Sequence, residues 1–384
     1  MKRGKATNRM LDFYLGIPIL NLIASFRRRG RFPHDPRAIG LLLNPALGDT
    51  MLASAAVQDV RSVFPSARLI LFATPSNAAA ARLLPAIDQI EMLPITRPLE
   101  ALRILKGCEL DLLLDFTSWQ RITAFYSRMS GAKFTVGFER KGQFRHRGYD
   151  ATVSHHGDCH EVENMRRLTR SIGAKRHYSP SLNIPEGPTP DVAASGKRPI
   201  VFHAWATGSL SVLREWPDDR WIELAQRIAA PGQKILLTGS PADEPRCRAL
   251  REKLHHHGID AEVLIGKDGI AGVARVLRQV EMLVSVNTGI MHLGAILGVP
   301  TVALNGPNSA HRWGPVGSRV ANVPTTDGSG GFLDLGFEFH GRNVMVNISV
   351  EDTVRAVEQL RSNAGQADAA MSDDPSLAEA EIVS

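Results

Sequence analysis

A regular alternation of short apolar runs with amphipathic segments constrains the fold of this chain more than any other feature. In the first half, strand-type runs lie at 38–43, 68–73, 111–115 and 134–138, between helical patterns at 51–63, 99–106 and 159–172. In the second half, strand-type runs lie at 199–203, 234–238, 261–265, 281–286 and 301–304, between helical patterns at 219–229, 243–256, 270–279 and 290–297. This alternation predicts two parallel, doubly wound α/β sheets that face each other across a cleft.

Breaks in the pattern divide the chain into segments. The length of 384 residues fits two domains of ordinary size with additional ends. We expect a basic apolar head at 1–37, a Rossmann-like domain at 38–180, a linker at 181–198, a second Rossmann-like domain at 199–348, a helix at 349–363 and an acidic, disordered tail at 364–384. The glycine-rich residues 325–343 are expected to form a loop over the cleft or a flexible excursion.

Charge is concentrated at the two ends of the chain. The net charge is +6, and residues 1–33 carry eight Lys or Arg against the single acidic residue Asp12. The last twenty residues carry five acidic residues and no basic one, so the body is only mildly basic. This distribution argues against a nucleic-acid-binding body and for a basic end that meets an anionic partner. Three widely separated cysteines predict a reducing compartment without disulfides.

The basic head contains an apolar run at 11–26 that is followed directly by arginines. As a helix this run would be roughly 24 Å long, which is short of the ~30 Å core of a bilayer. Pro18 would also kink it, and no cleavage site of a secretory signal follows. We therefore expect a segment that lies on the anionic cytoplasmic leaflet. The alternative is a helix packed on the protein's own body.

The first candidate site is the turn Gly48-Asp49, which follows the strand-type run at 38–43 and opens a helix. Open parallel sheets bind ligands at the carboxyl ends of their strands, where this turn lies. Gly48 permits a tight turn, and a helix start favours the ionised carboxylate of Asp49 that a general base needs. The alternative is an ordinary N-cap aspartate.

The second candidate site runs from Asn287 to His292, after the apolar run 281–286. Asn287, Thr288 and Gly289 form a strand-to-helix turn whose backbone N–H groups can hold a phosphate or diphosphate without a metal. The Thr288 hydroxyl can cap the helix, and His292 lies on the same helix face four residues later. The alternative is an ordinary turn with a packed histidine.

Four further residues are weaker candidates. Arg214 could reach a phosphate, although exposed arginines are usually solvated. Asp243 and Glu244 suit the ribose hydroxyls or the base of a nucleotide, and they are equally good first-turn helix residues. Arg121 belongs to a locally basic part of the first half that could steer an anionic acceptor, or that could simply be solvated.

Several common site motifs are missing from the sequence. There is no Asp-x-Asp pair, no phosphate loop with Gly-Lys-Ser/Thr and no Gly-x-Gly-x-x-Gly. Their absence weakens metal-bound nucleotide-sugar, ATPase and dinucleotide interpretations. The compact group His155, His156, Cys159 and His160 does not have a standard zinc spacing, so we expect no metal.

Two ordered signatures resemble glycosyltransferase family 9, which contains the ADP-heptose:lipopolysaccharide heptosyltransferases. Asn-Pro-Ala-Leu-Gly-Asp-Thr at 44–50, followed by a helix and Phe-Pro-Ser-Ala at 64–67, is similar to the family's N-terminal signature. Asn-Thr-Gly-Ile-Met-His-Leu at 287–293, with Gly-Val-Pro-Thr-Val-Ala-Leu-Asn-Gly-Pro at 298–307, is similar to its C-terminal signature. Arg-Glu-Trp-Pro at 214–217 and Asn-Ile-Ser-Val-Glu-Asp at 347–352 complete a likeness that covers about residues 38–362.

The resemblance implies a GT-B fold, with an acceptor-binding first domain and a nucleotide-sugar-binding second domain. It also implies a metal-independent, inverting transfer in which Asp49 is the general base. Thr288, Gly289 and His292 would hold the departing diphosphate, and Arg214 stands where lysine is common in the family. Without a metal, helix N–H groups and cations must stabilise the leaving charge. The chain departs from the family at Asn287, where aspartate is usual, so it lacks a charge there.

We therefore expect a cytoplasmic, peripheral membrane glycosyltransferase. Its donor would be a nucleotide-diphosphate sugar, namely ADP-heptose, and its acceptor a lipid-linked saccharide of the lipopolysaccharide core. One alternative is a family 9 transferase with another nucleotide sugar or acceptor. Another is a catalytically silent binding protein, which Asn287 favours and Asp49 opposes. A nucleotide-dependent oxidoreductase is disfavoured by the missing glycine fingerprint.

Overall fold

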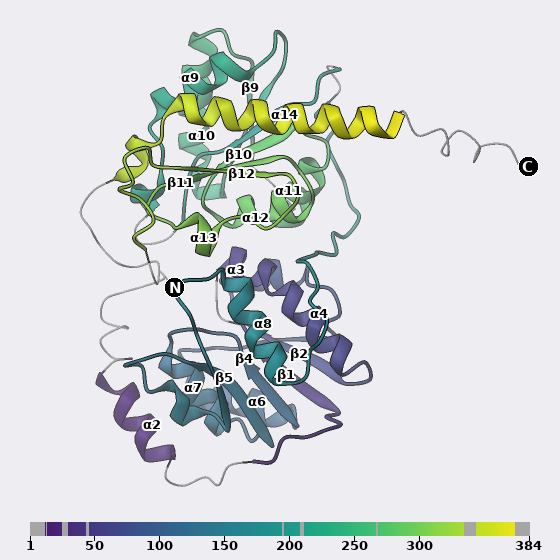
Figure 1. Ribbon diagram of the computed structural model, residues 1–384, viewed down its shortest axis with the longest axis vertical. Coiled ribbons are helices and arrows are strands. Elements are labelled where there is room, and N and C mark those ends of the chain that lie inside the picture. Colours follow the sequence, from purple (N-terminus) through teal and green to yellow (C-terminus); the bar gives the residue numbers. More distant parts are fainter. Residues whose placement is uncertain are drawn as a thin grey trace, which may run out of the picture.

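The computed structural model describes residue 12 and residues 14–24, 30–43, 46–193, 196–207, 211–265, 268–333 and 343–372, with side chains described as far as residue 363. Two α/β bodies lie one above the other along the long axis of the molecule (Figure 1). The first sheet contains β1 (Ala38–Leu42), β2 (Arg68–Ala73), β3 (Gln89–Met92), β4 (Leu112–Asp115), β5 (Phe134–Glu139) and β6 (Ala151–Ser154). The second contains β7 (Ile200–His203), β8 (Ile235–Thr238), β9 (Ala261–Leu264), β10 (Met282–Val286), β11 (Thr301–Asn305) and β12 (Val320–Pro324).

Helices follow most strands and cover the faces of both sheets (Figure 1). The helices of the first body are α2 (Gly16–Ala24), α3 (Leu47–Leu52), α4 (Ser54–Val63), α5 (Ala78–Ala81), α6 (Pro98–Gly107), α7 (Arg121–Met129), the 3₁₀ helix η1 (Arg145–Gly148) and α8 (Glu161–Ser171). Those of the second are η2 (Ser211–Arg214), α9 (Asp218–Ile228), η3 (Pro241–Asp243), α10 (Glu244–His256), α11 (Gly269–Leu277), α12 (Gly289–Ile296), α13 (Ala310–Trp313), η4 (Val344–Asn347) and α14 (Val350–Ser372).

Both sheets are parallel throughout and share one topology. The strand orders are β3-β2-β1-β4-β5-β6 and β12-β11-β10-β7-β8-β9, so each repeats the doubly wound order of a Rossmann fold. In such a sheet the order reverses between its first and fourth strands, and ligands bind beside their carboxyl ends. The reversal points here are the β1/β4 and β7/β10 pairs. The predicted fold of two Rossmann-like domains is therefore confirmed.

The sequence pattern explains why the strands are buried on both sides. In β1, Ile39 and Leu41 pack against α4 and α8, while Ala38 and Leu42 pack towards α6 and α7. Gly40 leaves room for the neighbouring strands, because a Cβ there would lie 2.8 Å from the Phe72 ring. Every residue of β1 and of β10 is buried, as expected for the central strands of a covered parallel sheet.

An apolar cluster joins the two domains. Met51 of α3 and Ala80 of α5 pack together with Val201, Leu236 and Leu293 of the second domain. These side chains are at most 1% exposed, so the junction resembles a domain core more than a wet contact. The α3–α12 contact lies at this junction.

The ends of the chain differ from the expected pattern in extent. Helix α14 continues to Ser372, past the expected end at 363, and it projects beyond the body in Figure 1. The rest of the acidic tail lies outside the described residues. Part of the expected loop at 325–343 is also outside them, but Gly331 and Leu333 donate backbone hydrogen bonds of 2.9 and 3.0 Å to Gly306 and Pro307. Its first part therefore lies along the loop that follows β11.

Candidate active site

The two predicted turns meet at the contact between the domains. Gly48 opens α3 after β1, and its hypothetical Cβ would lie 2.6 Å from Cδ2 of His292 and 3.5 Å from Cα of Gly289. A Cβ on Gly289 would lie 3.0 Å from that of Leu47. Side chains at these two glycines would therefore force the turns apart. The contact brings together loops that follow β1 and β10, one at each reversal point.

Asp49 lies in the first turn of α3, and hydrogen bonds fix the turn around it. Its Oδ2 accepts a hydrogen bond of 3.2 Å from the backbone N–H of Ala46. The fully buried Asn77 donates from Nδ2 to the Leu43 carbonyl (3.1 Å) and to the Thr50 hydroxyl (3.0 Å). Asn77 thus ties the end of β1 to the start of α3. Asn77 is not apparent as a site residue from the sequence, because it lies in a separate loop after β2.

Thr288 is the residue before the first turn of α12, but its side chain does not cap the helix in the expected way. Its hydroxyl makes no capping hydrogen bond and lies 3.5 Å from Oγ of Ser285. Thr288 and Gly289 are both partly exposed. The first N–H groups of α12 are therefore not covered by a side-chain cap, which suits a helix N-terminus that binds an anion.

His292 is buried directly behind this turn. Burial, together with the nearby His160, lowers the pKa of His292 to about 3. Its Nδ1 is buried without a hydrogen-bond partner among the described residues. The imidazole is therefore neutral near pH 7 in this structure, and it can offer an N–H group but not a positive charge.

A pH dependence of stability follows from His292 and from His203, which is also buried. Burial lowers the pKa of His203 to about 4, against an opposing effect of Asp243. Below pH ~6.5 both histidines bind protons in the unfolded chain but stay neutral in the folded one. The unfolded state then binds more protons, so stability should fall as the pH falls, by about 1.4 kcal/mol per pH unit for each histidine.

Unfolding in urea at about pH 7 and pH 5.5 measures this slope, since few carboxylates titrate between these values. His292→Gln should remove roughly half of the histidine contribution, whatever it does to the stability at pH 7. An unchanged pH difference in the variant would contradict the assignment of a neutral, buried His292.

Asn287 has a structural role at the end of β10. It is 7% exposed, and its Nδ2 donates to Oδ1 of Asn305 (2.7 Å) and to the carbonyl of Trp313 (3.0 Å). Asn305 in turn donates to Oδ1 of Asn322 at 2.8 Å. An aspartate at position 287 could not donate the first two bonds. This amide chain links the ends of β10 and β11 to the middle of β12 and to α13.

The residues considered for a metal site instead join the two domains. Oε1 of Glu161 accepts from Nε of Arg312 at 2.8 Å and lies 2.7 Å from its Nη2. His155 Nε2 lies 3.0 Å from Oε2 of Glu161. His160 accepts from the Val162 N–H through Nδ1, so its Nε2–H donates to the carbonyl of Gly314 at 3.0 Å.

Burial acts to raise the pKa of Glu161, but His155 and Arg312 outweigh it and hold that pKa below its ordinary value. Glu161 is therefore ionised and paired with Arg312. Among the described residues, no three His, Cys, Asp or Glu side chains are grouped so that they could hold a metal ion. The sequence pattern around His155 marks a domain contact that spacing alone did not reveal.

The other donor candidates lie at the same edge of the second sheet, but their side chains are engaged locally. Oδ2 of Asp243 accepts from the N–H and hydroxyl of Ser240, which makes it a helix-capping residue. Glu244 pairs with Arg248 at 2.6 Å, one turn further along α10. Arg214 ends η2 and donates to the Thr207 carbonyl at 2.5 Å.

Arg121 lies at the start of α7, but it is only 7% exposed. Its Nη1 lies 3.1 Å from Oδ2 of Asp12, and its Nε donates to the Gln143 carbonyl at 2.9 Å. An acceptor that used Arg121 would have to compete with the carboxylate of Asp12. The sequence did not suggest this pairing because more than a hundred residues separate the two.

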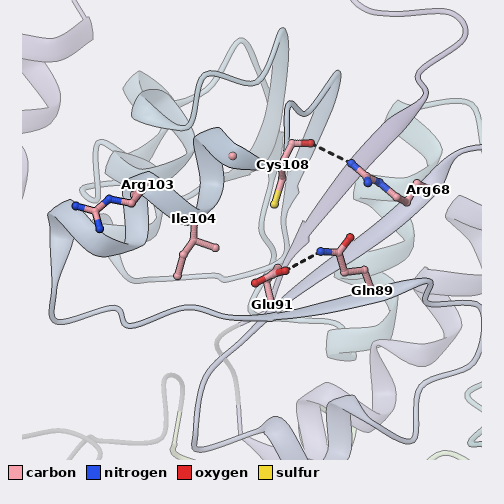
Figure 2. A pocket seen from close by; sticks show the side chains of 7 residues that line it. Arg68, Gln89, Glu91, Arg103, Ile104 and Cys108 are labelled. Atoms are coloured by element: carbon pink, nitrogen blue, oxygen red, sulfur yellow. Dashed lines mark hydrogen bonds between the residues drawn. The ribbon is translucent and has the colours of Figure 1, made fainter.

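Two surface hollows lie in the first domain. One, of about 370 Å³, is at the carboxyl ends of β5 and β6 and is lined by Glu139, Arg140, Lys141, Phe144, His146 and His155 among others. The other, of about 290 Å³, lies beside the edge strand β3 and the end of α6 (Figure 2). There Arg68 donates to the Cys108 carbonyl at 3.3 Å, and burial raises the pKa of the Cys108 thiol. Arg68 and Gln89 begin their strands, so this second hollow is reached from the edge opposite Asp49.

Comparison with known proteins agrees with this arrangement. A model of glycosyltransferase family 9 (heptosyltransferase) matches residues 99–329, which is more than half of the chain. The chain belongs to glycosyltransferase family 9. This family 9 protein is 26% identical over 227 residues to lipopolysaccharide heptosyltransferase 1 of Pseudomonas aeruginosa. That match covers 57% of the chain but only 61% of the relative.

Solved structures match over a longer range. A family 9 glycosyltransferase from Veillonella parvula aligns with a TM-score of 0.69 and 18% identity, covering 87% of this chain and 99% of that one. An Escherichia coli heptosyltransferase with ADP aligns with a TM-score of 0.65 and 20% identity, covering 84% and 99%. At these identities the likeness establishes the shared fold of family 9.

Proposed function

We propose that this family 9 protein is a metal-independent, inverting glycosyltransferase that transfers heptose from ADP-heptose to a lipopolysaccharide-core acceptor. The observation that carries the proposal is the contact between the Gly48-Asp49 turn and the start of α12. A carboxylate from one domain and an uncapped helix N-terminus from the other lie at the reversal points of their sheets. The P. aeruginosa relative is named a heptosyltransferase, and the E. coli neighbour was solved with ADP.

The proposed reaction is a single displacement. Asp49 takes the proton from an acceptor hydroxyl while that oxygen attacks the anomeric carbon of the donor. The bond from that carbon to the diphosphate oxygen breaks, and the sugar inverts. The N–H groups of Thr288, Gly289 and the next residues of α12 hold the leaving diphosphate, with an N–H of His292 as a further donor. Arg214 would supply positive charge from the loop after β7. Asp243 and Glu244 would lie beside the nucleotide of the donor.

The acceptor would approach from the first domain. The 370 Å³ hollow offers Arg140, Lys141 and His146 near the carboxyl edge of that sheet, and cations there suit an anionic saccharide. Arg121, which is paired with Asp12 of the head, belongs to the same basic region. A lipid-linked acceptor implies a peripheral position on the cytoplasmic face of the membrane.

Asn287 favours a second candidate, a family 9 transferase with another nucleotide sugar or acceptor. Its amide is held by Asn305 and Trp313, so position 287 offers no carboxylate to the donor. A silent nucleotide or sugar binder would keep the same contacts.

The direct test is a transfer assay with ADP-heptose and a deacylated core acceptor, run with and without EDTA. We expect turnover that EDTA leaves unchanged, because helix N–H groups and not a metal hold the diphosphate. Loss of turnover with EDTA would contradict the metal-independent proposal. A thermal-shift series with ADP, UDP and GDP separates the alternatives. Stabilisation by ADP alone supports the main proposal, stabilisation by another nucleotide supports the second candidate, and binding without turnover supports the silent protein.

A further inference from the structure

The head segment that contains helix α2 is held on the first domain by hydrogen bonds on both sides of the helix and by a small apolar cluster between them. At its start, the Asp12 carboxylate accepts from the backbone N–H groups of Arg121 (2.9 Å) and Ile122 (3.2 Å), so it caps α7. At its end, Nη2 of Arg128 donates to the Ala24 carbonyl at 3.1 Å. Between these points Leu20 is fully buried in a small cluster with residues of α7 and with Tyr149, which follows η1. One side of α2 therefore agrees with the alternative that the sequence left open, a helix packed on the protein's own body.

An apolar stripe formed by α2 and the two residues before it faces away from the body. Tyr14, Leu15, Ile19 and Leu22 are 65, 54, 40 and 62% exposed. Leu15, Ile19 and Leu22 follow one another at helical spacing and so form one continuous apolar stripe. Of the ten large apolar side chains that are exposed in the described part of the chain, four belong to this segment. A helix that packs on the domain and still exposes so much apolar surface indicates an interaction site.

The charge around this stripe is positive. Asp12 is the only acidic residue in positions 1–33, and its carboxylate is turned inward onto Arg121. The sequence carries basic residues on both sides of the stripe, at positions 2, 3, 5 and 9 and at positions 27, 28, 29 and 31. Helix α2 also contacts η1, where Arg147 is exposed and the neighbouring Phe144 is 39% exposed.

We propose that this stripe of α2, with Phe144 beside it, is a docking surface for an anionic lipid bilayer. Apolar side chains would enter the interfacial region, and the flanking cations would meet anionic headgroups. Within the part of the chain that the structure describes, no helix is both long enough and apolar enough to cross a bilayer. In the proposed contact, α2 lies in the plane of the membrane surface. The inference sharpens the peripheral location proposed above, but vesicle binding can be measured without any transfer reaction.

The position of α2 places this surface near the sheet edge that carries the proposed active site. Helix α7 begins just after the carboxyl end of β4, which neighbours β1 at the reversal point of the first sheet. Asp12 therefore fastens the head to the same sheet edge that carries Asp49. A bilayer against α2 would lie beside the side of the first domain that a lipid-linked acceptor must reach.

Substitutions on the exposed stripe test the proposal without disturbing the contacts that hold α2 on the first domain. Deleting the head would uncover Arg121 and the Leu20 pocket, so Leu15→Gln/Leu22→Gln is the better variant. Its matched control is Leu99→Gln, since Leu99 is 84% exposed on α6. Flotation would use vesicles of phosphatidylcholine with phosphatidylglycerol, and of phosphatidylcholine alone, at low and high salt.

We expect the unaltered protein and Leu99→Gln to float with the anionic vesicles, and less so at high salt. Leu15→Gln/Leu22→Gln should bind at least about tenfold more weakly. Equal binding by the double variant would overturn the proposal. So would a dimer in lipid-free solution that the same substitutions dissociate, because the stripe would then be a contact between two copies. Failure of the transfer assay alone would leave these results unaffected.

Discussion

Replacing Asp49 with asparagine is expected to lower kcat for glycosyl transfer by about 10³-fold, because the acceptor hydroxyl loses its general base. The substitution is almost isosteric. The side-chain oxygen of asparagine can still accept the Ala46 N–H that Oδ2 of Asp49 accepts at 3.2 Å, so the turn should keep its shape. Affinity for ADP should therefore change little. The measurements are steady-state kinetics with saturating donor and calorimetric titration with ADP.

Asp219→Asn provides the matched control. Asp219 also lies in the first turn of a helix, α9, but it is exposed and far along the chain from either signature. It should lose a similar small interaction with the helix dipole and keep full transfer activity. Normal turnover by Asp49→Asn would rule out Asp49 as the base. A parallel loss of ADP binding would show instead that the turn itself had been damaged.

The sequence predicted the centres of both sheets well and their edges poorly. The strands at 38–43 and 281–286 are continuous apolar runs because both of their faces are covered. The three strands that were missed, β3, β6 and β12, all lie at sheet edges, and their residues are mostly partly exposed. Edge strands can alternate polar and apolar residues, so a short one resembles a loop in the sequence.

The candidate site, like the sheets, could be predicted only in part. The Gly48-Asp49 and Thr288-Gly289 turns could be found because each is a local strand-to-helix signal. Their mutual contact could not, since it depends on how two domains pack. The same holds for Asn77, which positions the first turn from another loop, and for Arg121, whose partner Asp12 belongs to the head. Local pattern gives the elements of a site, whereas packing decides which side chains share it.

Breaking the Glu161–Arg312 pair should have the largest effect on stability. These two residues are 6 and 2% exposed, and the pair crosses from α8 to α13. Arg312→Met would leave the Glu161 carboxylate buried with only the His155 imidazole beside it. Loss of one member of a buried pair typically costs about 3–5 kcal/mol. Urea unfolding should show a loss of this size, and Arg227→Met, which breaks the exposed pair with Glu351, should cost less than about 1 kcal/mol.

The double variant Glu161→Met/Arg312→Met distinguishes a lost ion pair from lost packing. Because it removes both buried charges, it should be more stable than either single variant, whereas independent packing defects would add. The same variants test whether the pair supports the donor site. Helix α13 carries the Trp313 carbonyl that accepts from Asn287, and the Gly314 carbonyl that follows it accepts from His160. A displaced α13 should therefore weaken ADP binding by roughly tenfold in the single variants. If ADP affinity is unchanged while stability falls, the pair only fastens the domains, and the start of α12 is positioned without it.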